Sequence, residues 1–135
     1  MVEKNLVVSG KRKTAIAKAT IKDGVGKISI NRKAIKFFPE LQQLELKEPL
    51  IIAQEVLGKL NFDISVNVSG GGIGSRIEAA RLAIARAIVE FTKNTKLRQA
   101  YLAYDRNMLI ADTRRKEPYK PGDSKARAKR QSSKR

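Results

Sequence analysis

The chain has 135 residues, of which 29 are Lys or Arg and 13 are Asp or Glu, so its formal net charge is +16. It contains no Cys and no His, which excludes zinc sites built from these residues, a His general base and a Cys nucleophile. No run of 18 apolar residues exists, so we expect a cytoplasmic protein without a membrane partner, although basic segments can also bind anionic lipid.

Three short strands are predicted near the N-terminus. Residues 5–9 have an apolar centre, residues 14–21 alternate in polarity with three alanines on one face, and residues 27–31 place two isoleucines on one face. The turn signal Asp23-Gly24 separates the second strand from the third, so we expect the three strands to form a meander. Three consecutive cations lie between the first two strands: Lys11, Arg12 and Lys13.

Residues 32–60 predict one helical turn and one helix. The turn covers residues 32–38 and is stopped by Pro39. Glu48-Pro49 at the start and Gly58 beyond the end bracket a helix of about ten residues. Apolar residues within it recur at helical spacing and predict a buried stripe.

Residues 61–104 predict the clearest strand of the chain and two further helices. Apolar and polar residues alternate through residues 61–69. Ser75 and Glu78 match a capping box at the start of a helix that runs to about Lys93. The last helix covers residues 95–104.

The long predicted helix carries alanines that suit close packing on a sheet, whereas Arg81 and Arg86 lie outside its apolar stripe and are interpreted as solvated. Residues 105–111 follow as a connector whose apolar side chains anchor it to the body. Together these elements predict an α+β body over residues 1–111, with a four-stranded mixed sheet and helices packed on one face.

Residues 112–135 carry ten Lys or Arg against three acids, and no Val, Ile, Leu, Met, Phe or Trp. Such a segment has nothing to bury, so we expect an extended basic tail that is disordered without RNA and lies along a polyanion. If all ten basic groups met phosphates, log affinity would fall with log salt with a slope of about −7 to −9. Since aromatic residues make up 5% of the chain, we expect recognition of phosphates and RNA shape rather than a base-stacking platform.

The glycines 70–72 precede the long predicted helix and have three interpretations. They form a tight reversal with positive φ, they bind an RNA phosphate at the helix start, or they belong to a phosphate-transfer enzyme. The Walker and Rossmann spacings do not fit, and no persuasive carboxylate pair exists. The three N-terminal cations are either a solvated hairpin corner or a phosphate contact. A non-enzymatic RNA-binding protein is therefore favoured over an enzyme or a histone-like nucleic-acid chaperone.

Three motifs follow one another along the chain. They are Ser9-Gly10-Lys11-Arg12-Lys13-Thr14-Ala15, then Gly70-Gly71-Gly72 with Ala83-Ile84-Ala85-Arg86-Ala87, then Asp112-Thr113-Arg114-Arg115-Lys116-Glu117-Pro118 with Gln131-Ser132-Ser133-Lys134-Arg135. In this order they resemble the universal small-subunit ribosomal protein S nine family, in its archaeal and eukaryotic branch. The family usually has Gln at the position of Arg76.

The resemblance implies a fold like the second domain of ribosomal protein S five, with a left-handed β-α-β crossover. It also implies a structural role on the rRNA of the small-subunit head, beside neighbouring head proteins, with no cofactor, no metal and no homo-oligomer. The end of the tail would reach the anticodon stem-loop of the P-site tRNA through Ser133, Lys134 and Arg135. The expected rRNA contacts are Lys11, Arg12, Lys13, Gly70, Gly71, Gly72, Arg76, Arg114, Arg115, Lys116, Lys120, Lys125, Arg127, Lys129 and Arg130.

Overall fold

A computed structural model, which describes residues 5–114, contains one mixed sheet with the strand order β1-β2-β5-β3-β4. The strands are β1 (Leu6–Arg12), β2 (Ala15–Asp23), β3 (Ile28–Ile30), β4 (Lys33–Ala34) and β5 (Phe62–Ser69). The helices are α1 (Glu40–Leu57), α2 (Ile73–Thr92) and α3 (Thr95–Tyr104), with 3-10 turns η1 (Ile35–Phe37) and η2 (Arg106–Met108). The predicted α+β class is confirmed. The predicted count of four strands is wrong, because the two-residue β4 pairs with β3 where a helical turn alone was expected.

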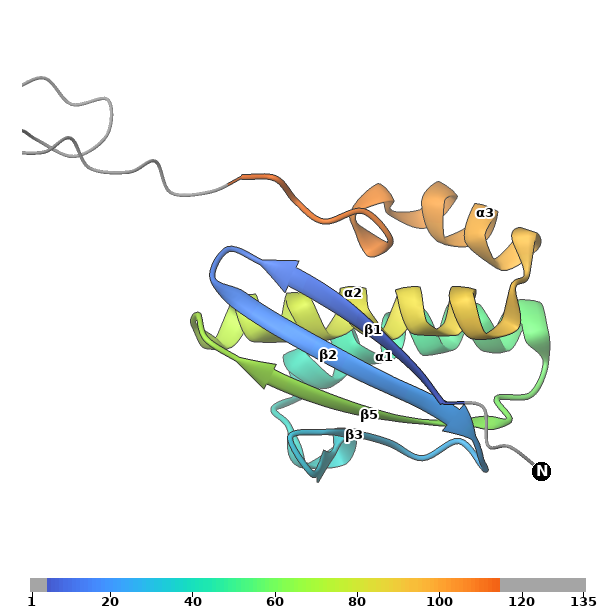
Figure 1. Ribbon diagram of the computed structural model, residues 1–135, viewed down its shortest axis with the longest axis horizontal. Helices are drawn as coiled ribbons and strands as arrows, with labels where there is room; N and C mark the ends of the chain where they lie inside the picture. The colour runs from blue at the N-terminus through green and yellow to red at the C-terminus, as the bar shows by residue number, and fades with distance from the viewer. Residues whose placement is uncertain (1–4, 115–135) are drawn as a thin grey trace, which may run out of the picture.

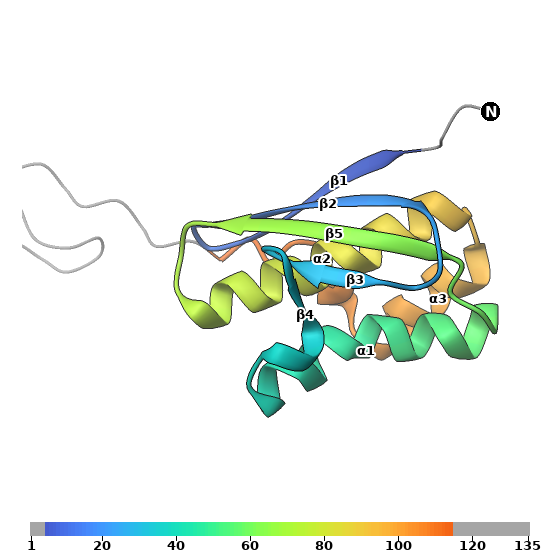
Figure 2. The same ribbon diagram turned by 90° about the horizontal axis from the view of Figure 1, so that it is seen from below.

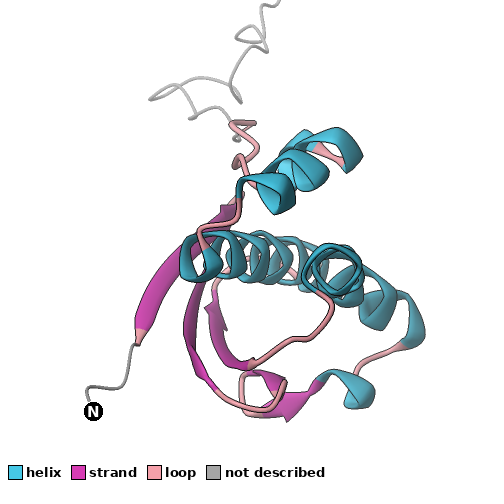
Figure 3. Cartoon of the chain, turned by 90° about the vertical axis from the view of Figure 1, so that its right-hand side faces the viewer, coloured by secondary structure: helices cyan, strands magenta, loops and turns pink. Residues whose placement is uncertain are grey.

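The elements form three layers. Helix α2 packs across β1, β2 and β5, and α1 packs beside α2 (Figures 1 and 2). Helix α3 packs on α1 and α2, on the side away from the sheet (Figure 3). The expectation of helices on one face therefore holds for α1 and α2, while α3 adds a further layer above them.

Strand β5 lies between β2 and β3, so the predicted meander is wrong. It pairs antiparallel with β2 and parallel with β3. Asp63 on β5 explains the path, because its Oδ1 accepts the backbone N–H groups of Val25, Gly26 and Lys27 at 3.1, 3.1 and 2.9 Å. These hydrogen bonds hold the turn after β2 against the start of β5. Strand β3 therefore begins on the side of β5 opposite to β2. These bonds, led by that of Lys27, hold the pKa of Asp63 below its ordinary value of 3.8.

Helix α1 begins at Glu40, eight residues before the predicted start, and carries Pro49 in its interior. A proline there removes one backbone hydrogen bond of the helix. In this chain Pro49 is buried in the core, and its carbonyl accepts a hydrogen bond of 2.6 Å from the hydroxyl of Tyr101 on α3. Packing of the proline therefore offsets the lost bond. The predicted end is confirmed, since Gly58 caps the helix with φ 82°.

Helix α2 begins at Ile73, with Gly72 as its N-cap and no side-chain cap. The predicted capping box is wrong, because the Gly72 carbonyl already accepts the N–H of Arg76 at 3.0 Å and Ser75 lies inside the first turn. The carboxylate of Glu78 pairs instead with Arg12 on β1. Most of the remaining length of α2 is buried, as the predicted stripe and alanines require.

Helix α2 approaches the sheet very closely at Gly10 on β1. A Cβ placed there would lie 2.5 Å from the carbonyl oxygen of Ala79 and 2.7 Å from the amide nitrogen of Ala83. The two backbones therefore nearly touch, which requires glycine on the strand and small residues on the helix. This contact fixes α2 along β1 and sets the position of the N-terminal end of the helix.

Candidate nucleic-acid interface

The first hairpin and the glycine turn lie side by side at one end of the sheet (Figure 1). A Cβ on Gly70 would lie 2.7 Å from the carbonyl oxygen of Thr14, and one on Gly71 would lie 2.9 Å from the Cβ of Ala15. Both glycines have positive φ, at 76° and 65°. The structural interpretation of the turn is therefore confirmed for these two positions.

The next two glycines are different. Gly72 has a φ of −89°, and a Cβ added to Gly72 or Gly74 would meet nothing within 4 Å. The fold does not require glycine at either position, and the backbone at the start of α2 is left open. Unsatisfied N–H groups and the helix dipole favour an anion at such a place. Arg76 is exposed beside it, oriented by a 2.9 Å hydrogen bond from its Nε to the Gly70 carbonyl.

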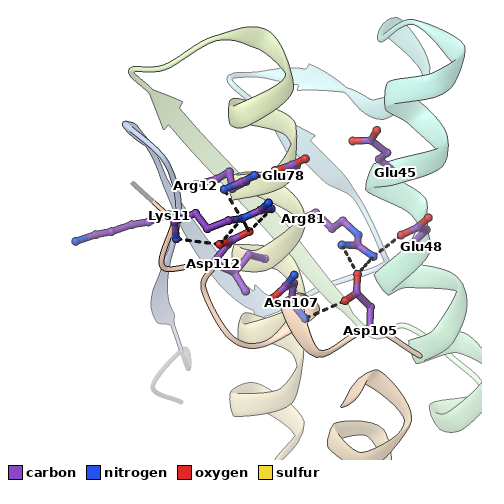
Figure 4. A pocket seen from close by; sticks show the side chains of 11 residues that line it. Lys11, Arg12, Glu45, Glu48, Glu78, Arg81, Asp105, Asn107 and Asp112 are labelled. Atoms are coloured by element: carbon purple, nitrogen blue, oxygen red, sulfur yellow. Dashed lines mark hydrogen bonds and ion pairs between the residues drawn. The ribbon is translucent and has the colours of Figure 1, made fainter. Parts of the chain in front are cut away.

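The three hairpin cations have different surroundings. Lys11 and Lys13 are exposed. Arg12 is only 15% exposed, and it pairs with Glu78 on α2 and, through Nη1, with Asp112 at 3.3 Å (Figure 4). Hydrogen bonds from Arg114, together with the charge of Arg12, hold the pKa of Asp112 far below its ordinary value. Arg12 therefore shares its charge with two carboxylates, whereas the lysine charges are available to a ligand.

A polar hollow of about 310 Å³ lies behind the hairpin, between α1, α2 and the chain that follows α3 (Figure 4). Arg81 pairs there with Glu48 and, at 3.4 Å, with Asp105. Because five acids face four cations in its lining, it is no anion site. Within residues 5–114, no cluster of three or more Asp, Glu, His or Cys could hold a metal ion, and no helix is long and apolar enough to cross a membrane.

Three arginines hold the connector, residues 105–111, and the adjoining Asp112 against the body. Arg81 pairs with Asp105, and Arg12 pairs with Asp112. Between them, Arg86 donates from Nε to the Leu109 carbonyl at 2.8 Å and from Nη1 to the Ser9 carbonyl at 3.1 Å. Met108 is fully buried, so apolar packing adds to these bonds. The connector therefore reaches the same end of the molecule as the hairpin (Figure 1).

The interpretation of Arg81 and Arg86 as solvated is thus wrong. The sequence carried a signal for this, because Arg86 is flanked by the apolar residues Ala85 and Ala87. In the structure both alanines are buried. A helix that is apolar on most of its circumference is covered on more than one face. A cation on such a helix must find partners within the protein, as Arg86 does.

The structure brings several predicted site residues to one end of the body, which we name the basic end. Its members are Lys11, Arg12, Lys13, Gly70, Gly71, Gly72, Arg76 and Arg114. The remaining predicted contacts lie outside the residues that the structure describes. These are Arg115, Lys116, Lys120, Lys125, Arg127, Lys129, Arg130, Ser133, Lys134 and Arg135.

The chain is similar over nearly its whole length to known proteins. The model of the family described as Ribosomal protein S9/S16 matches residues 10–135. The Small ribosomal subunit protein uS9 of Methanococcus maripaludis strain C7 is 49% identical over 127 residues, which cover 92% of this chain and 93% of the relative. The protein of the same name from Methanococcus vannielii is 47% identical over 127 residues, with the same coverage.

Proposed function

Because the chain belongs to the Ribosomal protein S9/S16 family, we propose that it binds small-subunit rRNA through the basic end of its body and through its C-terminal residues. Family membership confirms the resemblance drawn from the three motifs. It makes the chain a structural protein of the small ribosomal subunit, in the cytoplasm, and not an enzyme. We also propose that one copy of the protein lies in the head of the small subunit, beside other head proteins. Its β-α-β crossover is proposed to be left-handed, like that of ribosomal protein S five.

The observation that carries the proposal is the convergence at the basic end. The hairpin, the glycine turn and the end of the connector are far apart in sequence, yet they meet at one place. At this end of the body Lys11, Lys13 and Arg76 are exposed, and the start of α2 is open. Phosphate groups bind such a combination of cations and free backbone N–H groups. Arg12 completes the predicted set and also fixes the hairpin to Asp112, next to the connector.

The remaining rRNA contacts are proposed along residues 114–130, which continue the chain from the basic end. Arg114 is the last described member, and it is exposed beside Asp112. Phosphate contacts of this kind position a protein without reading sequence. The final residues Ser133, Lys134 and Arg135 are proposed to reach the anticodon stem-loop of the P-site tRNA, as the family resemblance implies.

The rRNA proposal is tested by the salt dependence of binding to a fragment of the small-subunit head rRNA. The double substitution Lys11→Gln with Lys13→Gln should lower the affinity and reduce the salt slope by about 2, because each lost phosphate contact removes about 0.9 from it. The matched control is Lys47→Gln with Lys59→Gln, two exposed lysines on and just after α1. Equal slopes for the two double variants would contradict a phosphate contact at the hairpin.

Deletion of residues 133–135 tests the tRNA contact. The truncated protein should enter small subunits normally, while the affinity of purified subunits for P-site tRNA falls by about tenfold, as expected for charge-assisted contacts worth about 1.5 kcal/mol. The variant Lys129→Gln with Arg130→Gln removes the same number of side-chain charges and should affect assembly rather than tRNA. Unchanged tRNA affinity after the deletion would remove this part of the proposal.

A further inference from the structure

A groove of about 390 Å³ adjoins the basic end, between the β3–β4 hairpin, η1 and the start of α2. Its apolar lining includes Ile30, Phe37, Phe38 and Ile73, and its cations are Lys33 and Arg76. No acidic residue lines it, in contrast to the hollow behind the first hairpin. The groove is continuous with the basic end, because Arg76 belongs to both.

The apolar walls of the groove face solvent. Phe37 is 70% exposed and Ile73 is 69% exposed. The Nζ atom of Lys36 lies over one face of the Phe37 ring, 5.2 Å from its centroid, so a further cation stands at the aromatic ring, which still remains largely exposed. An apolar surface that is held open and surrounded by cations marks a binding site for a ligand that is both apolar and anionic.

Side-chain hydrogen bonds fix both walls. Gln43 donates from Nε2 to the carbonyls of Lys36 at 3.1 Å and Phe38 at 2.6 Å, which holds η1 against α1. On the opposite wall, Asn31 donates to the Val68 carbonyl at 3.3 Å and accepts from its N–H at 2.8 Å. The groove therefore exists before a ligand arrives, and binding costs little ordering of the protein.

We propose that this groove binds one unpaired nucleotide of RNA, an inference that rests on the proposed rRNA-binding function. The base would stack on Phe37 and contact Ile73, while its flanking phosphates would meet Lys33, Lys36 and Arg76. A nucleotide combines a flat apolar face with a phosphate joined to it through the ribose, which suits a groove that presents an aromatic ring together with cations. RNA is favoured over an acidic protein segment because Arg76 joins the groove directly to the basic end.

A tryptophan in place of Phe37 provides a direct readout, since the chain contains no Trp. The full-length Phe37→Trp variant is titrated with single-stranded oligouridylate and with an RNA duplex of equal length. Stacking of an unpaired base should quench the fluorescence with the single strand and leave it unchanged with the duplex. Quenching by both RNAs to the same extent, or by neither, would overturn the inference.

Affinities of Phe37→Ala provide the second readout. Loss of the stacked base should weaken single-strand binding by about fivefold or more, with duplex binding unchanged. The control Val25→Ala alters another exposed apolar residue, 79% accessible, and should bind both RNAs like the parent protein. Circular dichroism checks that both variants fold, which the exposure of Phe37 leads us to expect.

Other results distinguish a failure of the groove inference from a failure of the proposed rRNA-binding function. If the parent protein binds both RNAs and Phe37→Ala binds them equally well, the groove inference is wrong while the proposed function stands. If Phe37→Ala retains RNA affinity but no longer enters small subunits, the groove binds a protein and the inference is also wrong. If the parent protein binds no RNA at physiological salt, the proposed function fails, and the inference fails with it.

Discussion

At the scale of single residues, five of the glycines at or near the basic end fall into two groups. Gly10, Gly70 and Gly71 stand where a side chain has no room, because backbone or side-chain atoms lie within 3 Å of the place a Cβ would take. Gly72 and Gly74 face open space. The first group serves the fold, and the second is free to serve a ligand that approaches the backbone closely.

This division predicts opposite effects for two substitutions to alanine. Gly10→Ala should destabilise the protein by about 3 kcal/mol or more, because the added methyl group forces α2 away from β1. Gly74→Ala, within the first turn of α2, should stabilise it by about 0.5–1 kcal/mol through helix propensity. Urea unfolding measures both, and a neutral Gly10→Ala variant would contradict the packing of strand against helix.

Asp63 predicts an acid-sensitive turn. Because its folded pKa is lowered, its contribution to stability is present above the unfolded value of 3.8 and is lost as the pH falls through the folded pKa. Asp63→Asn should therefore be less stable than the parent at pH 7, and the difference should shrink below pH 4. The control Asp23→Asn changes an exposed aspartate at the end of β2. A difference independent of pH would show that charge is not the cause.

At the scale of elements, the periodicity of apolar residues predicts the bounds of individual strands and helices. The alternation through β5 and the apolar spacing of α2 and α3 placed these elements within three residues of their observed bounds. Strand order is not local, because the position of β5 depends on hydrogen bonds that the side chain of Asp63 accepts from residues nearly forty positions away. Likewise, the extent of α1 depends on the burial of Pro49 beneath Tyr101, which no helix-boundary rule includes.

The connector predicts the effect of removing one arginine. Arg86→Ala deletes the bonds to Leu109 and Ser9, so the amides of the connector should exchange hydrogen at least tenfold faster, as expected when interactions worth about 1.5 kcal/mol are lost. The amides of β5 should be unaffected. Arg98→Ala, an exposed arginine on α3, is the matched control. Equal exchange in both variants would show that apolar packing alone holds the connector.

At the scale of the whole molecule, the charge predicts the class of partner, whereas the topology determines which residues meet at one place. The excess of cations in the sequence predicts a polyanionic partner, and the motifs supply the candidate contact residues. Their convergence was not predictable, because it depends on the pairing of β2 with β5, which brings residues some 55 apart in sequence into contact. The pairing of Arg12 with Glu78 and Asp112 was not predictable either, because a basic motif does not show which carboxylates its cations will pair with.

The central claim is that this chain is an RNA-bound component of the small ribosomal subunit. Sedimentation of a cell lysate through a gradient at high salt tests it most directly. We predict that the protein travels with small subunits, remains there after DNase treatment and is released by RNase. Recovery at the top of the gradient, or loss from the small-subunit fraction on DNase treatment alone, would contradict the account.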